Sequence, residues 1–142
     1  MLAPSLFLYA TACVTPAVHF FRIGGGPEGW YGIEALLLGW QGAFVGQFGW
    51  FANPLLLLAV VPILFRRFVI GSILAIMAVA VATDSLLILH QQIPGDEGDV
   101  THLIVTGFGA GFYFWFASLL AAIVAPIAGA LFVRYRARTQ RA

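Results

Sequence analysis

Three long apolar runs, separated by short polar or glycine-rich segments, dominate the sequence. They cover residues 5–21, 68–89 and 103–133. The second run has about the 20 residues that a helix needs to cross a bilayer. The third would be roughly 45 Å long as a helix, so it must tilt, project from the membrane or bend at Pro126. This pattern predicts a helix over each of the three runs.

The stretch between the first and second runs is too long for one crossing and somewhat short for two. Asn53-Pro54 supplies the break, because Asn caps the free N–H groups of a helix and Pro suits its first position. We therefore predict a helix over residues 54–66. Upstream, we predict a helix over residues 30–49 that lies in the interface or enters the membrane without crossing it.

Two topologies follow, and both are all-α, integral membrane helical bundles that form one domain over residues 1–142. The first has four transmembrane helices plus the membrane-embedded or interfacial helix 30–49, with a cytoplasmic N-terminus. In the alternative, residues 30–49 cross fully, which gives five transmembrane helices and an external N-terminus. Arg22 favours the alternative through the positive-inside rule. We favour the first, because the crossing that ends at Arg66 can then begin near Gly46 and reach full length.

Small residues recur at helical spacing along several of these segments. Glycine or alanine stands at every third or fourth position from Gly32 to Gly49, which would place these residues on one helical face. A second stripe runs from Gly71 to Ser85, and a third runs from Gly107 to Gly129. Such faces let helix backbones approach closely. We predict a helix-packing role for Gly39, Gly42, Gly46, Gly49, Gly107 and Gly111.

The composition narrows the class of protein further. Of the 142 residues, 61% are hydrophobic and 9% are charged, whereas soluble domains carry about 45–50% apolar and about 25% charged residues. So few charged side chains cannot cover a soluble domain, which excludes an ordinary cytosolic enzyme and a nucleic-acid-binding domain. Cys13 is the single cysteine, so neither an intramolecular disulfide nor dithiol exchange is possible.

The distribution of charge predicts the orientation. All basic residues are arginines, and they cluster at 66–67 and in the tail over 134–142, while acidic residues cluster at 96–99. By the positive-inside rule, the arginine clusters and the C-terminus should be cytoplasmic and the acidic loop should be external.

Asp84 is the first candidate for chemistry. It lies about six positions from the outer end of the helix predicted over 68–89, where a carboxylate costs several kcal/mol unless it is paired, hydrated or protonated. It is either a relay group or a polar tie between helices, and we favour the tie. Glu34 and Gln41 share a helical face and are further relay candidates, although the polar face of an interfacial helix is the simpler interpretation.

Three histidines form a second candidate site. In the four-crossing topology His19, His90 and His102 all fall at the outer ends of helices, where imidazoles could bind a divalent metal or haem. No helical His pair or haem-attachment motif supports this, so we expect no cofactor and keep haem or a metal as the alternative.

Aromatic residues are concentrated in two places. Trp30, Trp40 and Trp50 suit the aromatic belt at a membrane surface. The run 112–116 is entirely aromatic and must contact lipid, neighbouring helices or a bound hydrophobic ligand such as a quinone, sterol or pigment. We favour ordinary packing for this run.

One segment carries a resemblance. Gly39-Trp40-Gln41-Gly42, followed by Trp50-Phe51-Ala52-Asn53-Pro54 and a leucine run, resembles a pattern in small bacterial polytopic membrane proteins. The resemblance covers about 20 residues. It implies a bacterial inner-membrane location and carries no activity.

These observations predict a multi-pass accessory or interaction protein rather than an enzyme. Its partners would be the lipid bilayer and other membrane subunits or further copies of the chain. The reason is that few polar side chains fall within the apolar runs, whereas a solute pathway usually needs a chain of them. The alternatives are a protein that binds haem, a metal or a hydrophobic cofactor, and a small transporter or proton-conducting subunit that uses Asp84.

Overall fold

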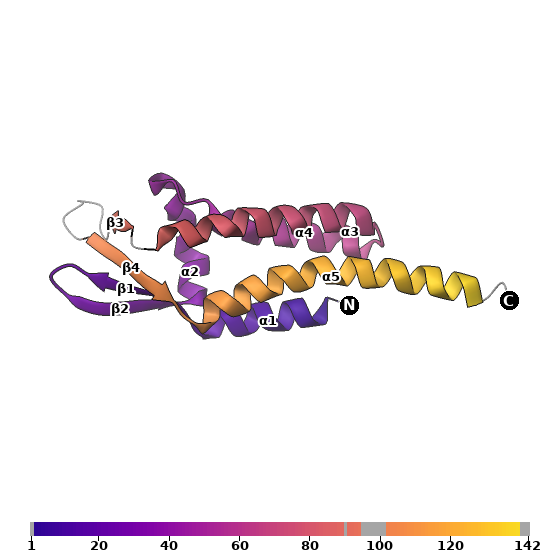
Figure 1. Ribbon diagram of the computed structural model, residues 1–142, viewed down its shortest axis with the longest axis horizontal. Helices are drawn as coiled ribbons and strands as arrows, with labels where there is room; N and C mark the ends of the chain where they lie inside the picture. Colours follow the sequence, from indigo (N-terminus) through magenta and orange to yellow (C-terminus); the bar gives the residue numbers. More distant parts are fainter. Residues whose placement is uncertain (1, 90, 95–101, 140–142) are drawn as a thin grey trace.

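The computed structural model describes residues 2–89, 91–94 and 102–139, and it is mostly helical (Figure 1). Four helices lie side by side along the long axis, and a small sheet lies at one end. The helices are α1 (Ala3–Val14), α3 (Ala52–Leu64), α4 (Phe68–Ala82) and α5 (Ala110–Thr139). A 3-10 helix, η3 (Thr83–Ile88), extends α4 toward the sheet.

The sheet has four antiparallel strands in the order β2-β1-β4-β3. These are β1 (Pro16–Arg22), β2 (Gly26–Tyr31), β3 (Gln92–Pro94) and β4 (His102–Phe108). A glycine turn joins β1 to β2, and Gly24 in that turn has a φ of 86°, a conformation that favours glycine. Arg22 forms an ion pair of 2.8 Å with Glu28 across this hairpin.

The prediction of an all-α bundle with four transmembrane helices therefore holds only in part. The chain is mostly helical, but the ends of two predicted helices are strands, and two of the described helical stretches, rather than four, are long and apolar enough to cross a membrane. The predicted helix 5–21 ends at Val14, because Pro16 disfavours the helical conformation in the residue before it. The β-branched and aromatic residues that follow form β1. The predicted helix 103–133 begins only at Ala110. Leu103 and Val105 are buried in alternation, which is the pattern of a strand rather than a helix.

The predicted helix over 30–49 is also wrong in its extent. It is divided into α2 (Gly32–Leu38), the 3-10 helix η1 (Gly39–Val45) and a turn before η2 (Gly49–Phe51). Gly46 ends η1 with a φ of 78°. The small residues of this stretch therefore share no continuous helical face, and no helix of crossing length is present there, contrary to the five-crossing alternative.

The predicted helix 54–66 corresponds to α3, but Asn53 does not cap it. Phe51 is the N-cap residue, so Pro54 lies at the third helical position instead of the first. The Asn53 side chain bonds to other elements, as described below. The predicted helix 68–89 corresponds to α4 together with η3.

The interior of the bundle consists largely of small side chains. The prediction of a packing face on α4 is confirmed, since Gly71, Ala75, Ala78 and Ala82 are all buried. Ser118 and Ala122 on α5 are fully buried in the same region, and the Ser5 hydroxyl donates a 2.9 Å hydrogen bond to the backbone oxygen of Ser118. Small facing residues let the helices approach closely.

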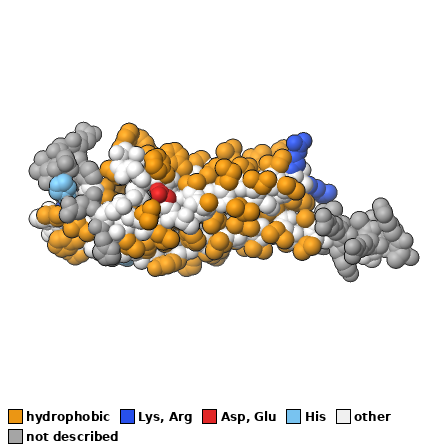
Figure 2. Space-filling model, turned by 45° about the horizontal axis from the view of Figure 1, so that its top comes forward, with side chains coloured by type: hydrophobic (Ala, Val, Ile, Leu, Met, Phe, Trp, Pro, Cys, Tyr) orange, Lys and Arg blue, Asp and Glu red, His pale blue; other side chains and the backbone are white. Residues whose placement is uncertain are grey.

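Large apolar side chains instead cover the outside of the helices (Figure 2). Exposed examples are Phe7 on α1, Leu57 on α3, Ile73 on α4 and Val124 on α5. Two helical stretches, Phe68–Ile88 and Ala110–Leu131, are long and apolar enough to cross a membrane, with 21 and 22 residues. Large side chains outside and small ones inside are typical of helices whose solvent is lipid.

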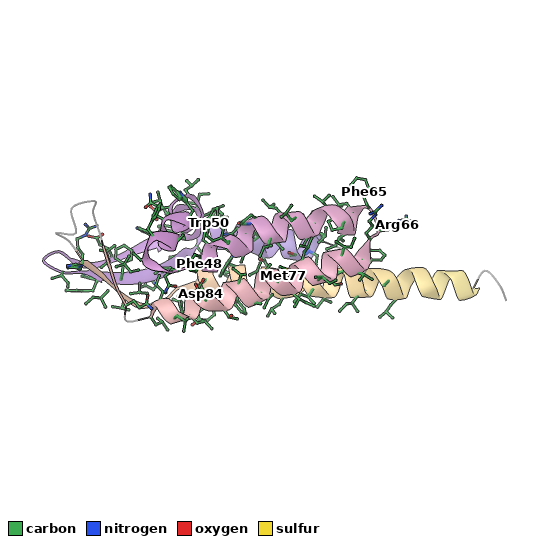
Figure 3. All side chains as sticks on the ribbon, turned by 90° about the horizontal axis from the view of Figure 1, so that it is seen from above. Phe48, Trp50, Phe65, Arg66, Met77 and Asp84 are labelled. Atoms are coloured by element: carbon green, nitrogen blue, oxygen red, sulfur yellow. The ribbon has the colours of Figure 1, made fainter. Side chains whose placement is uncertain are left out.

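The two ends of the bundle differ. Arg66 and Arg67 are exposed in the turn between α3 and α4, at the end opposite the sheet (Figures 1 and 3). The C-terminal end of α5 projects beyond the bundle at this same end. The predicted acidic loop at 96–99 lies outside the described residues.

Candidate functional site

A large, partly enclosed cavity lies between the helical bundle and the sheet. Its volume is about 870 Å³, and its lining is mainly apolar and aromatic. Residues of α1, α5, the sheet and the whole segment from α2 to the start of α3 contribute to its walls. Such a volume lies within the range of roughly 300–1,000 Å³ that ligand sites in proteins occupy.

Asn53 is the centre of a hydrogen-bond network at this cavity. Its Oδ1 atom accepts hydrogen bonds from the Tyr9 hydroxyl at 2.9 Å and from the Trp115 Nε1–H group at 2.8 Å. Its amide nitrogen donates to the backbone oxygen of Trp50 at 2.9 Å. Asn53 thus links α1, α5 and the segment before α3, and it is itself buried. The network fixes the position of three helices where the bundle meets the cavity.

Trp50 holds the outer wall of the cavity in place. Its Nε1–H group donates a 2.7 Å hydrogen bond to the backbone oxygen of Leu36 in α2. A Cβ atom at Gly39 would lie 2.6 Å from the Trp50 ring, so a larger residue at position 39 would displace the indole. Glycine at this position therefore permits the contact between α2 and η2.

Gln47 introduces a buried amide into the cavity wall. Only 8% of the residue is exposed, and its Nε2 donates a 2.8 Å hydrogen bond to the Oε1 of Gln91. Its own Oε1 is buried and has no hydrogen-bond partner in the part of the chain that the structure describes. An unsatisfied buried acceptor costs about 1–3 kcal/mol, so a donor that reached this atom would be bound favourably.

Aromatic rings provide most of the remaining surface. All four tryptophans of the sequence, Trp30, Trp40, Trp50 and Trp115, line the cavity. Trp30 packs edge-on against Phe20 across β1 and β2, with ring centroids 5.6 Å apart. Phe108 and Phe112 stack at 3.9 Å where β4 leads into α5. Because most of these rings lie on different elements, packing within one helix does not account for their convergence.

Asp84 ties two segments together beside this cavity (Figure 3). Its Oδ2 atom accepts a 2.6 Å hydrogen bond from the backbone N–H of Phe48. The next residues are in close contact as well, because a Cβ atom on Gly49 would clash with the side chain and backbone of Ser85. This hydrogen bond ties η3 to the turn before η2, rather than one helix to another as in the predicted tie.

The two other relay candidates do not join Asp84. Glu34 accepts a 2.7 Å hydrogen bond from the backbone N–H of Tyr31 at the start of α2, which is a helix-capping interaction on the surface. Gln41 is exposed in η1 and lines the cavity. Neither side chain forms a chain of groups with Asp84 among the hydrogen bonds that the structure describes.

The structure places two of the predicted histidines in the sheet rather than on helices. His19 is paired with Gly107 of β4, whereas His102 is paired with Pro94 of β3. Five residue positions along β4 separate these pairs, which is roughly 17 Å. His90 lies outside the described residues. Across the residues that are described, no group of three or more His, Cys, Asp or Glu side chains could hold a metal.

The glycines predicted for helix packing have different environments. Gly42 contacts Gln47 within the same segment, and Gly46 has the left-handed conformation noted above. Gly111 lies against backbone oxygens of Thr15 and Ala12, so it permits close contact between α1 and α5. Gly107 lies in β4 with open space around its Cβ position, and the prediction that it packs on a helix is wrong.

Comparison with protein-family models, with curated proteins and with solved structures finds no match. The resemblance to small bacterial membrane proteins therefore stays a prediction. Both parts of that pattern contribute to the cavity, through residues 39–42 and through Trp50 and Asn53.

Sequence reasoning missed the cavity and the network around Asn53. Tyr9 and Trp115 are polar aromatic residues in apolar runs, which was the available signal, but only the fold brings them to one acceptor. The position of Asn53 before a proline predicts that its side chain caps a helix. Its burial and three side-chain hydrogen bonds instead identify it as the link between the helices and the cavity.

Proposed function

We propose that this chain is a polytopic membrane protein that binds an apolar or amphipathic small molecule in the cavity between its helices and its sheet. The observation that carries this proposal is the cavity of about 870 Å³ lined by all four tryptophans. Buried aromatic surface favours an apolar ligand through the hydrophobic effect, at roughly 25 cal/mol per Å² removed from water. Aromatic faces also favour rings and unsaturated chains.

The membrane placement is supported by the distribution of side chains. Helices α3, α4 and α5 are covered by large apolar residues on the outside and are joined through small ones inside. Helix α1, with 12 residues, reaches roughly 18 Å into the bilayer beside α5. All four helices would then lie in the membrane, although α1 by itself is too short to cross a hydrocarbon core of about 30 Å.

The sheet would lie outside the hydrocarbon region. Among the described residues, its outermost strands, β2 and β3, are each paired on one side only, and free backbone N–H and C=O groups are not tolerated in lipid. The exposed Arg66 and Arg67 would then lie on the cytoplasmic side, by the positive-inside rule. The cavity would therefore open near the outer headgroups, at the depth that tryptophan side chains prefer.

A few polar groups would orient the ligand. The Oε1 of Gln47, which has no partner among the described residues, would favour a ligand with a hydroxyl or N–H group, and Gln41 adds an exposed amide to the same cavity. An apolar site with few polar groups is the usual composition of a small-molecule site. We therefore favour an amphipathic ligand with one hydrogen-bonding end.

Native mass spectrometry tests this proposal directly. Protein extracted in a mild detergent should carry a bound small molecule, or should bind farnesol as a model amphipathic ligand with one-to-one stoichiometry. Ala35→Phe, inside the cavity, should reduce the bound fraction, whereas Ala80→Phe on the outer surface of α4 should leave it unchanged. Absence of any bound molecule in the unsubstituted protein in both experiments would refute the proposal.

The other predicted roles remain predictions. The accessory role and the bacterial inner-membrane location rest on composition and on the resemblance. The haem or metal alternative rests on the histidines, and the transport alternative rests on Asp84 as a relay. The tie between Asp84 and Phe48 favours a structural role for this acid over a relay.

A further inference from the structure

A second hollow lies on the outside of the bundle, far from the cavity. It is a groove of about 750 Å³ between α3 and α4, which we name the α3–α4 groove. Six apolar residues and one charged residue line it: Leu58, Val61, Pro62, Phe65, Ile70, Leu74 and Arg67. Phe65 and Arg66 mark this end of the bundle in Figure 3.

The charge lies at one end of the groove. Arg67 directly precedes α4, at the exposed turn, while Leu74 lies seven residues further along the chain. At 1.5 Å per residue the apolar part of the groove extends roughly 10 Å from the arginine toward the middle of the bundle. This length suits the upper part of an acyl chain.

The side chains around the groove leave it open. Phe65 is 75% exposed and Leu58 is 57% exposed, so the apolar surface of the groove is not covered by the rest of the chain. In a membrane, this surface would be in contact with lipid acyl chains. The guanidinium group at its end presents up to five N–H donors that match a phosphate group.

We propose that the α3–α4 groove binds an anionic phospholipid of the cytoplasmic leaflet. Its phosphate binds to Arg67, and one acyl chain lies between α3 and α4. The proposal rests on the membrane placement proposed above, but it is independent of the ligand in the cavity. The second arginine at the turn, Arg66, is exposed but does not line the groove, so it provides a control with the same charge.

The experiment is a competition in detergent micelles between phosphatidylglycerol and phosphatidylcholine with identical acyl chains, with bound lipid counted by native mass spectrometry. One arginine near a membrane surface attracts an anionic lipid by about 1 kcal/mol, so about a five-fold preference for phosphatidylglycerol is expected. Arg67→Gln should reduce this preference to nearly one. Arg66→Gln should leave most of it intact.

Two further arms test the groove itself. Ile70→Trp fills the groove and should lower the bound phosphatidylglycerol, whereas Ile73→Trp lies on the lipid-facing side of α4 outside the groove and should not. Glycerol phosphate, which has the headgroup chemistry without acyl chains, should not compete. The far-UV circular dichroism of each variant establishes that it is folded.

Three outcomes would overturn the proposal: equal binding of the two lipids by the unsubstituted protein, an equal loss of preference in both arginine variants, or competition by glycerol phosphate. Failure of the membrane placement has a different signature, because the protein would then be extracted from cells without detergent.

Discussion

Replacing Asn53 by leucine should destabilise the protein more than any other single change of a polar residue near the cavity. The substitution keeps the approximate shape of the side chain but removes the acceptor for Tyr9 and Trp115 and the donor to Trp50. Hydrogen bonds between membrane helices contribute about 0.6 kcal/mol each on average. Each buried donor left without a partner costs about 1–3 kcal/mol. We therefore expect a loss of about 2–4 kcal/mol in the free energy of unfolding.

The assay is reversible unfolding in mixed micelles by titration with a denaturing detergent. The transition should be followed by far-UV circular dichroism, because two of the network residues, Trp50 and Trp115, are fluorescent and their signals would change for local reasons. A loss below about 0.5 kcal/mol, which is the range of ordinary surface substitutions, would refute the reasoning.

A double-mutant cycle separates the network from general effects. Tyr9→Phe should cost about 0.6–1.7 kcal/mol in the unsubstituted protein. When Asn53 is already leucine it should cost nothing or recover part of the lost stability, because it removes a hydroxyl that has lost its acceptor. Thr11→Val is the control on the same helix. Among the hydrogen bonds described, the Thr11 hydroxyl bonds only to the backbone oxygen of Phe7, one turn earlier. Loss of this hydroxyl should therefore have almost no effect on stability. Equal costs for Tyr9→Phe in both backgrounds would show that the hydroxyl does not act through Asn53.

Three further predictions follow from other contacts. Asp84→Ala should increase hydrogen–deuterium exchange in the turn before η2, whose backbone N–H it binds, while leaving the far end of α4 unchanged. Ala78→Leu should destabilise the bundle by about 1–3 kcal/mol in the same micelle assay because position 78 is fully buried, whereas Ala80→Leu on the exposed face should change it little. The hydrogen bond from Arg22 lowers the pKa of Glu28, so this pair stabilises the hairpin above the ordinary carboxyl pKa and loses its effect as the pH falls through the lowered value. Glu28→Gln should abolish this pH dependence of amide exchange in β1 and β2.

The elements that sequence alone predicted well are those whose environment is uniform along their length. Helix α4 is apolar on its outside and has small residues inside from Gly71 to Ala82, so its periodicity indicates both the helix and its packed face. The start of α3 was also predicted to within two residues, because Pro54 lies in its first turn. In each case the local sequence and the tertiary contacts favour the same structure.

The sheet could not be predicted because β1 and β4, its two central strands, are largely apolar and lie within runs that also form helices. Residues 16–21 look like the end of a membrane helix, and only pairing with β2 and β4 makes them a strand. The short alternation of Leu103 and Val105 was hidden within a longer apolar run. For short apolar segments, periodicity does not distinguish helix from strand, and the partner strands decide.

The core of the bundle and the walls of the cavity are built from side chains of different size. Small residues of α3, α4 and α5, such as Ala59, Ala75 and Ala122, are fully buried and let these helices approach closely. The walls of the cavity instead include the large side chains of Tyr9, Trp50 and Trp115, which hydrogen bonds hold in place. The sheet contributes further residues to the lining. Because Asn53 binds both Tyr9 and Trp115, one network joins α1, α3 and α5 and fixes two of the aromatic side chains that line the cavity. Its loss should therefore affect both the stability of the fold and the proposed binding site.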